Sequence, residues 1–490
     1  MSLSYLLADD HTTMLNIIEK ILCHFESCFS RKAAFRWFVI IITGLMLRSD
    51  KLGVTSILRD LALAPGCYDS ILHFFRASSW SLEDIRKRWF SAVRLYAPLY
   101  KEGNFHVLVG DGVKQSKEGR RMPGVKKLFQ ESENSAKPEY MHGHMFGGLG
   151  ILAGNFRSWA CIPLSIRLHD GLQAAREWKG ASVSTASHVV QMVEDSYHAA
   201  LTFGDSLLLL DRYFLTVPAL EKLRELNNSG KVHMEIVTKA KKSCTAFQKP
   251  GPRKPGRGRP PKKGDAVHLK GLFASHKEQF METETELYGK KKTIRYYSID
   301  LLWGQKLYQE LRFVLVEMDG IQSILASTSL ALDPLSIIRL YSYRFRIECT
   351  FRELKQQTGA FCYHFWSKHM PKLSYYQKKG EPTPLERVED ERSRKKILKT
   401  VRAIEVHMEL SCIAMGILQT LSSRFIGKVC SSQIRYQRTP SKGRVSEAAL
   451  MHYFRKHFFR LLEQKPKSYI TQIIHELQEE SEKHWDFLAS

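Results

Sequence analysis

The sequence predicts an α/β protein in which a mixed sheet with helices is flanked by helical regions at both ends. Short apolar segments, two of which end beside an aspartate, alternate with helical segments between residues 104 and 238. Residues 1–103 and 426–490 carry helical patterns instead. A chain of 490 residues is too long for one core, so we expect two to four domains.

Composition indicates a globular protein with a polyanionic partner. The hydrophobic fraction is 43% and the net charge is +24. An excess of this size favours nucleic acid, because basic side chains release counterions from phosphates. A generally basic surface or a membrane-surface protein is the alternative.

The cysteines and the apolar runs indicate in which cellular compartment the protein is expected. None of the nine cysteines forms a C-x-x-C pair, which argues against a zinc site. Their odd number, with no secretory signal, indicates reduced thiols in the cytoplasm. The longest apolar run, Trp37–Leu47, is shorter than the roughly 20 residues that span a bilayer. We therefore expect a buried helix there and no membrane partner.

Residues 1–103 are expected to form a helical domain. Within it, Thr55–Leu63, a turn at 64–66 and Cys67–Arg76 resemble a helix-turn-helix, which would allow DNA binding. A plain helical bundle explains the same pattern.

Residues 104–238 are expected to contribute the first part of the α/β layer. The expected strands are Phe105–Val109, Met141–Leu152, Trp159–Leu168, Ser206–Leu210 and Val232–Thr238, and the expected helices are Ser187–Leu201 and Val217–Asn227. The second and third strands should form a hairpin.

Residues 239–332 are expected to hold a basic arm and a β-rich insertion. Lys239–Lys263 has ten Lys and Arg residues and no acidic residue, so it should be a solvated arm. The expected strands are Ile294–Leu302, Arg312–Met318 and Ile324–Leu330. Residues 333–425 should carry a helix around Glu348 and a long amphipathic helix at Ile397–Phe425, and residues 426–490 a basic helical region.

Four polar residues have helical spacing. Tyr341, Arg344, Glu348 and Lys355 stand at offsets 0, 3, 7 and 14, which fall within roughly 60° of one another around an α-helix. An adjoining apolar stripe would dock this helix on a core. A carboxylate flanked by cations on a docked helix suits a metal ion beside a phosphate.

Two aspartates complete a candidate metal centre. Asp111 and Asp211 each follow an apolar strand, where a side chain can enter a crevice at the sheet edge. With Glu348 they could hold two Mg²⁺ or Mn²⁺ ions, since hard cations take oxygen ligands. Two such ions promote in-line phosphoryl displacement. The alternative for either aspartate is simply that it caps a turn.

The spacing Tyr341-x2-Arg344-x3-Glu348-x6-Lys355 resembles the Tyr-Arg-Glu-Lys signature of DDE transposases from bacterial insertion sequences, the insertion-sequence-four-like group. The order of strands, helices and insertion is similar too, over roughly residues 100–425. The resemblance implies a ribonuclease-H-like fold with Asp111, Asp211 and Glu348 as the metal-binding triad. It implies that Tyr341, Arg344 and Lys355 contact phosphates of the transposon end.

Three further DNA-binding residues are expected. The related enzymes flip a base out of the duplex, and Trp303 in the insertion is a candidate stacking platform. A core Trp is the alternative. Pro255-Gly256-Arg257-Gly258-Arg259-Pro260 resembles an AT-hook, whose arginines enter a narrow minor groove. A phosphate-binding arm without sequence preference is the alternative.

The expected function is cut-and-paste transposition of an insertion sequence. The chain would cut DNA at terminal inverted repeats and join the freed end to target DNA, as a homodimer in the bacterial cytoplasm, associated with the nucleoid. A DNA-binding descendant without catalysis and a ribonuclease-H-like nuclease without strand transfer remain alternatives.

Overall fold

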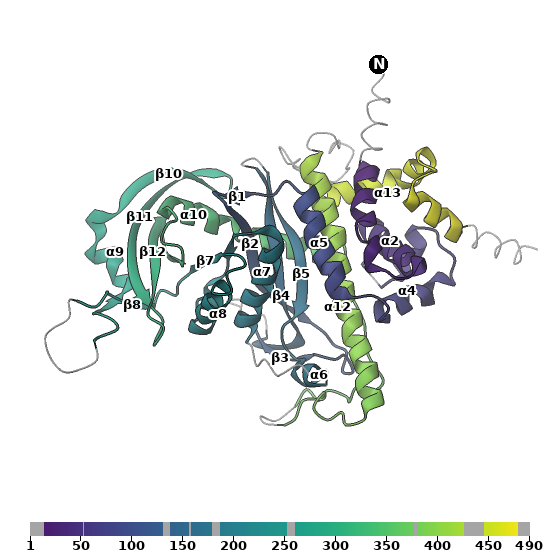
Figure 1. The fold of residues 1–490 in the computed structure, drawn as a ribbon, viewed down its shortest axis with the longest axis horizontal. Helices are drawn as coiled ribbons and strands as arrows, with labels where there is room; N and C mark the ends of the chain where they lie inside the picture. The colour runs from purple at the N-terminus through teal and green to yellow at the C-terminus, as the bar shows by residue number, and fades with distance from the viewer. Residues whose placement is uncertain are drawn as a thin grey trace, which may run out of the picture. The chain divides into compact units, whose positions relative to one another are not determined.

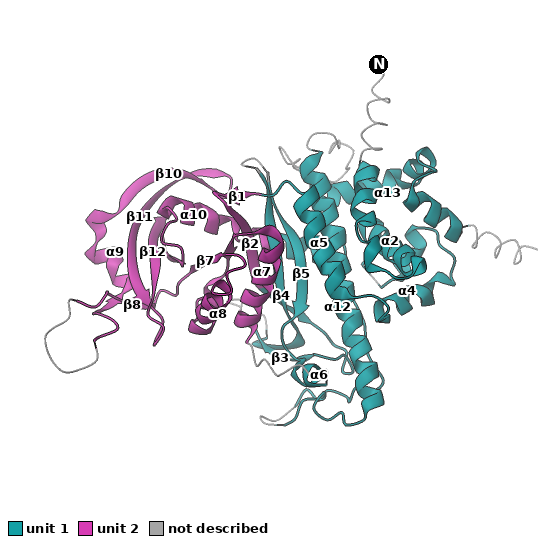
Figure 2. Ribbon diagram, viewed as in Figure 1, with its two compact units in different colours: residues 1–99, 112–185, 349–490 teal, residues 100–111, 186–348 magenta. Residues whose placement is uncertain are grey.

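The computed structural model describes residues 14–51, 53–130, 138–155, 158–178, 187–251, 260–376, 381–425 and 445–478. The chain forms two compact units, coloured separately in Figure 2. The first unit comprises residues 1–99, 112–185 and 349–490, and the second comprises residues 100–111 and 186–348. Strand β2 (Phe105–Ser116) and helix α11 (Arg346–Gln356) each contribute residues to both units.

The first unit is mainly helical (Figure 1). Its helices are α2 (Lys32–Leu47), α3 (Thr55–Asp60), α4 (Cys67–Arg76), α5 (Leu82–Tyr96), α6 (Gln173–Glu177), α12 (Glu391–Arg424) and α13 (Glu447–Gln464). The apolar run around α2 is a buried helix, as expected. No helix in the described ranges is long and apolar enough to cross a membrane.

Helix α4 has the bounds expected for the second helix, whereas α3 ends at Asp60, three residues before the expected end at Leu63. The turn between them includes Ala62 with a left-handed φ of 53°. The exposed positions of α4 include Tyr68, Asp69 and His73, and none of its exposed positions is Lys or Arg. This helix face therefore offers little for binding phosphates.

Helix α12 corrects the expectation of an amphipathic helix at Ile397–Phe425. It begins earlier, at Glu391, where the side chain of Asp390 accepts hydrogen bonds from the first turn. Most residues from Thr400 to Ser422 are buried, because α2, α4, α5 and strand β5 (Ser158–Leu168) all pack on it. A helix covered on all sides needs no polar face.

The first unit also holds the expected hairpin. Strands β4 (Tyr140–Asn155) and β5 pair antiparallel, and β3 (Lys126–Phe129) pairs with the start of β4. A Cβ atom on Gly148 of β4 would lie 2.5 Å from the ring of Phe351 on α11. The glycine thus lets the Phe351 ring pack directly on the strand backbone.

The second unit contains three adjacent parallel strands. Strand β6 (Ser206–Leu209) lies between β2 and β7 (Met234–Lys239) and pairs parallel with both. Helix α7 (His188–Phe203) precedes β6, and helix α8 (Val217–Asn227) connects β6 to β7. All four residues of β6 are buried, as expected for a strand covered on both faces.

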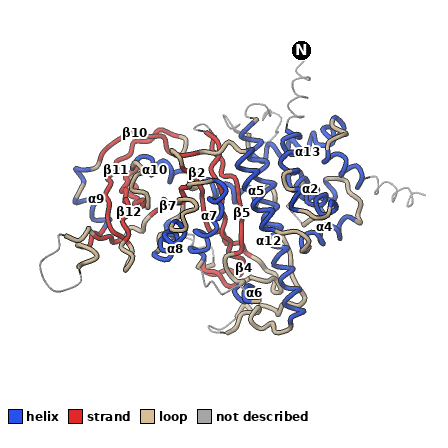
Figure 3. The backbone as a smooth tube through the Cα atoms, viewed as in Figure 1, coloured by secondary structure: helices blue, strands red, loops and turns tan. Residues whose placement is uncertain are grey.

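The insertion extends this sheet with antiparallel strands, drawn in red in Figure 3. Its strands are β8 (Thr245–Phe247), β9 (Ala266–His268), β10 (Met281–Leu287), β11 (Lys290–Trp303), β12 (Gln309–Met318) and β13 (Ile321–Ser327). Strand β13 pairs with β7, and helix α10 (Pro334–Tyr343) follows it. The second unit also contains the short strand β1 (Lys101–Glu102) and helix α9 (Leu272–Ser275).

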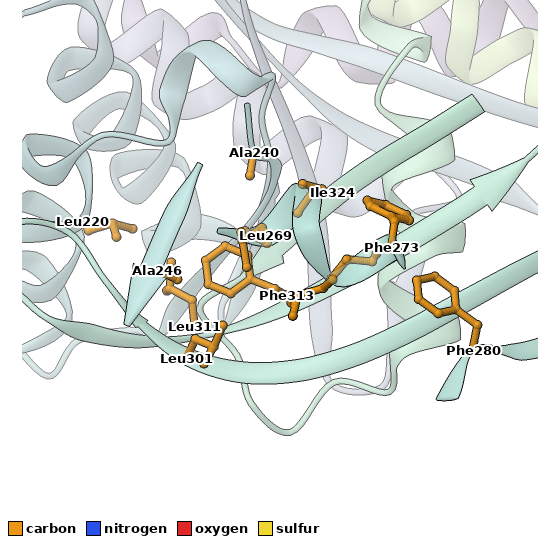
Figure 4. Close-up of a cluster of buried hydrophobic side chains, with 13 residues drawn as sticks. Leu220, Ala240, Ala246, Leu269, Phe273, Phe280, Leu301, Leu311, Phe313 and Ile324 are labelled. Carbon is orange, nitrogen blue, oxygen red and sulfur yellow. The ribbon is translucent and has the colours of Figure 1, made fainter. Parts of the chain in front are cut away.

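The insertion has a hydrophobic cluster of its own (Figure 4). Phe313 is fully buried at its centre, with Leu301 and Leu311 nearly so. Side chains from β11, β12 and β13 build it together with Leu220 of α8. The expected β-rich insertion is therefore a packed layer.

Candidate active site

Asp111 lies within β2, which corrects the expectation that the strand ends before it. The neighbouring Gly110 serves close packing instead of a turn, since a Cβ there would lie 2.7 Å from the sulfur of Met192 on α7. The parallel pairing of β2 with β6 stops at Val109. Asp111 consequently stands just beyond the carboxyl end of that pairing, with a side chain 18% exposed.

Strand β6 ends at Leu209, one residue earlier than expected, and Asp211 follows after Leu210. Its Oδ1 accepts a hydrogen bond of 2.6 Å from the backbone N–H of Arg212, and its carbonyl oxygen accepts one of 2.8 Å from Thr238 Oγ1 at the end of β7. One carboxylate oxygen thus caps a short turn. Asp111 and Asp211 each lie two residues past the point where the parallel pairing of β2 with β6 stops.

The helix expected around Glu348 is two helices, so the prediction of one continuous face is wrong. Helix α10 ends at Tyr343 and α11 begins at Arg346. The N–H groups of Arg344, Ile347 and Glu348 donate to carbonyls three residues earlier, which tightens the turn. Tyr341 therefore lies on α10, Arg344 at the junction, and Glu348 and Lys355 on α11.

Arg344 joins two of the predicted acids. Its Nη1 lies 3.0 Å from Asp111 Oδ2, and its Nη2 donates to Glu348 Oε1. The Arg344 side chain is 14% exposed, whereas that of Glu348 is 54% exposed. The guanidinium therefore forms a partly buried bridge between the strand and the helix junction.

The charge of Asp211, the third predicted acid, also acts on Arg344. Burial alone would lower the pKa of Arg344, but the charges of Asp111, Glu348 and Asp211 outweigh it and raise this pKa above its usual value. Burial raises the pKa of Tyr341, against the effect of Arg344, so its hydroxyl stays protonated. Asp111, Asp211, Tyr341, Arg344 and Glu348 thus belong to one electrostatic neighbourhood within the second unit.

Two cations beside this group were missed by the sequence reasoning. Lys239 is the last residue of β7 and is half-buried, and Arg212 follows Asp211. Burial and the positive charge of Arg212 lower the pKa of Lys239, while Asp211 acts in the opposite direction. Lys239 at the end of one expected parallel strand and Arg212 shortly after another were signals that could have identified them.

The remaining predicted DNA-binding residues are placed differently. Lys355 is half-buried in the first unit, with Nζ 5.3 Å from the ring centre of Phe361, and burial lowers its pKa. Trp303 packs against the insertion core and hydrogen-bonds to the thiol of Cys244, which supports the alternative of a core Trp. Arg257 and Arg259 lie outside the described residues.

The carboxylates of Asp111, Asp211 and Glu348 are suitable ligands for a divalent ion, but their spacing in this structure is not that of a metal site. Carboxylate oxygens are the hard donors that Mg²⁺ and Mn²⁺ prefer. Within the described ranges, however, no three His, Cys, Asp or Glu side chains gather closely enough to hold one ion. The positive charge shared by Asp111 and Glu348 in this structure is the Arg344 guanidinium.

Comparison with known proteins identifies the family. Residues 24–297 match the family described as DDE superfamily endonuclease, which is more than half of the 490 residues. The chain therefore belongs to the DDE superfamily endonucleases, which are metal-dependent nucleases acting on DNA. The matched region contains Asp111 and Asp211 but ends before Glu348. Searches of curated proteins and of solved structures gave no match.

Proposed function

We propose that this DDE endonuclease is the transposase of a bacterial insertion sequence of the insertion-sequence-four-like group. It would act by cut-and-paste, cleaving DNA at terminal inverted repeats and joining the freed 3′ end to target DNA. One observation carries the proposal: Arg344 of the Tyr-Arg-Glu-Lys spacing pairs with both Asp111 and Glu348. The signature and a strand-end aspartate thus meet in one site.

The fold we propose is ribonuclease-H-like. The parallel pairing of β2, β6 and β7 supports it, as do Asp111 and Asp211 just past the paired parts of β2 and β6. The insertion separates these strands from the helix that carries Glu348, as in the resembled family. We also propose the division into 1–103, 104–238, 239–332, 333–425 and 426–490 as functional regions, with 104–238 and 333–425 forming the catalytic domain.

Asp111, Asp211 and Glu348 would hold one or two Mg²⁺ or Mn²⁺ ions, which would activate the attacking oxygen and stabilise the leaving one. Arg344 carries a permanent charge and a forked set of donors, which suit a DNA phosphate. Tyr341 keeps its proton and can donate a hydrogen bond to a phosphate oxygen. Lys239 and Arg212 would hold the DNA backbone beside Asp211 through their positive charge.

The first proposed partner is double-stranded DNA, both the element ends and the target. The second is another copy of the chain, in the complex that brings two ends together. The net charge of +24 supports a DNA partner. The cytoplasm, where the element's DNA is located, is the proposed compartment.

The experiment is a transposition assay with the gene's own flanking DNA. A donor plasmid would carry a marker between the two flanks, and the protein would be supplied from a second plasmid. We expect marker excision and its insertion at new sites, both dependent on Mg²⁺ or Mn²⁺. Excision without insertion would favour a nuclease without strand transfer. If the protein binds DNA but neither excises nor inserts the marker, a non-catalytic descendant is favoured.

A further inference from the structure

Arg344 occupies an unusual position for a residue expected to bind DNA. Its guanidinium donates to Asp111 and to Glu348, which are two of the three proposed metal ligands. The donors thus point at acids of the site itself. This inference rests on the proposed function, because it assigns Arg344 a role toward the metal ion as well as toward DNA.

The bridge is built to be stable in the DNA-free protein. The Arg344 side chain is only 14% exposed, and a guanidinium cannot lose its proton to relieve a buried charge. It therefore needs negative partners nearby, and Asp111, Glu348 and the field of Asp211 supply them. The local backbone supports the geometry, since the tight turns at Arg344–Glu348 bring the two side chains to the same side.

A divalent ion and Arg344 compete for the same carboxylates. An ion held by Asp111 and Glu348 would bring two positive charges next to the guanidinium, and like charges at that distance repel strongly. The guanidinium also engages one oxygen of each carboxylate directly. Tight ion binding therefore requires Arg344 to turn away.

A DNA phosphate can draw the guanidinium away from the acids. Arginine pairs with phosphate through two parallel hydrogen bonds, as it does with carboxylate. We propose that Arg344 is an internal counter-ion that weakens divalent-ion binding in the free protein and is released by a DNA phosphate. Because linkage is reciprocal, DNA then tightens ion binding by the same factor that the ion tightens DNA binding.

The test measures Mn²⁺ binding to the full-length protein by electron paramagnetic resonance, with and without duplex DNA. The variants are Arg344→Gln and, as matched control, Arg352→Gln. Arg352 is on α11, two turns beyond Arg344, pairs with Glu353 and is 59% exposed, so its removal takes away the same charge. Thermal unfolding would verify that each variant folds.

We expect Arg344→Gln to bind Mn²⁺ about tenfold more tightly than wild type without DNA, with Arg352→Gln unchanged. Adding DNA should tighten Mn²⁺ binding in wild type but hardly in Arg344→Gln. An Arg344→Gln effect no larger than that of Arg352→Gln would overturn the proposal.

A further variant separates this proposal from the proposed function. Asp111→Asn should lose Mn²⁺ binding, because a ligand is removed. If Asp111→Asn loses binding while Arg344→Gln matches wild type, the ion site stands and only the counter-ion role fails. If Asp111→Asn binds Mn²⁺ like wild type, the metal centre of the proposed function fails as well.

Discussion

Arg86 and Arg344 each bridge two acids, but in different surroundings. In the first unit, Arg86 pairs with Glu83 and Glu409, linking α5 to α12, and Glu409 is completely buried. In the second unit, Arg344 pairs with Asp111 and Glu348, and Glu348 is 54% exposed. The chemistry of the two bridges is the same, while their access to water and ligands differs.

The difference indicates what each bridge can do. The Arg86–Glu409 pair joins two helices inside a core, so no ligand can replace Glu409 without opening the unit. The Arg344 bridge joins a strand end to a helix junction, where Asp211 and Lys239 add further charge. We interpret the first as structural and the second as an exchangeable pairing in a catalytic site.

Removing a proposed metal ligand should nearly abolish DNA cleavage. Asp111→Asn, Asp211→Asn and Glu348→Gln each take away a hard oxygen donor, and the loss of several kcal/mol of ion-mediated stabilisation corresponds to about 10³-fold in rate. Cleavage of end-containing DNA in Mg²⁺ measures it. Glu83→Gln, at the exposed end of the Arg86 bridge, is the control and should cleave normally. A Glu348→Gln variant with wild-type cleavage would contradict the assignment.

The free energy of unfolding should depend more on the Arg86 bridge than on the Arg344 bridge. Arg86→Ala leaves Glu409 charged and unpaired in the core, which costs about 3–5 kcal/mol. Arg344→Ala leaves Asp111 partly solvated and Glu348 half-exposed, and should cost less, about 1–3 kcal/mol. Urea unfolding followed by circular dichroism compares the two variants. Equal losses would mean that the two bridges do not differ as described.

The buried bridge should also impose a pH dependence. Burial raises the pKa of Glu409 to about 6 from its ordinary 4.5, against the lowering effect of Arg86. Because the folded state then holds the proton more tightly, the stability contributed by Glu409 is greatest below pH 4.5 and falls as the pH rises to 6. The change is on the order of 2 kcal/mol. The difference in unfolding free energy between wild type and Glu409→Gln should follow this curve, and a difference independent of pH would refute it.

The smallest effect concerns the basic arm. Combining Arg257→Ala with Arg259→Ala should weaken duplex binding modestly and make the plot of log affinity against log salt shallower by about 2. Fluorescence anisotropy at several salt concentrations measures the slope. Lys292→Ala with Lys395→Ala removes two lysines that are paired with acids, and should change the slope less. Equal slopes in wild type and the arginine variant would exclude the arm from the DNA interface.

The sequence predicted the elements of the α/β layer well, because short buried strands and helices have strong local patterns. It identified Asp111 and Glu348, which the structure joins through Arg344. It did not predict the helix junction at Arg344, since no Gly or Pro marks it. It also could not predict the pairing of Arg86 with Glu409, because 323 residues separate them and neither stands in a motif.

The same limits explain the errors in detail. Gly110 suggested the end of a strand, but its missing side chain accommodates Met192. The pattern of α12 suggested one polar face, yet neighbours on every side bury it. In each case a contact between distant segments decided the outcome.

We propose that Asp111, Asp211 and Glu348 hold a divalent ion in the DNA-bound protein. Replacing Mg²⁺ by Fe²⁺ in the presence of duplex DNA, then adding ascorbate and peroxide, cuts the polypeptide next to the bound ion. We predict cuts near residues 111, 211 and 344–348 that disappear in Asp111→Asn. Cuts elsewhere in the chain that persist unchanged in Asp111→Asn would contradict the account.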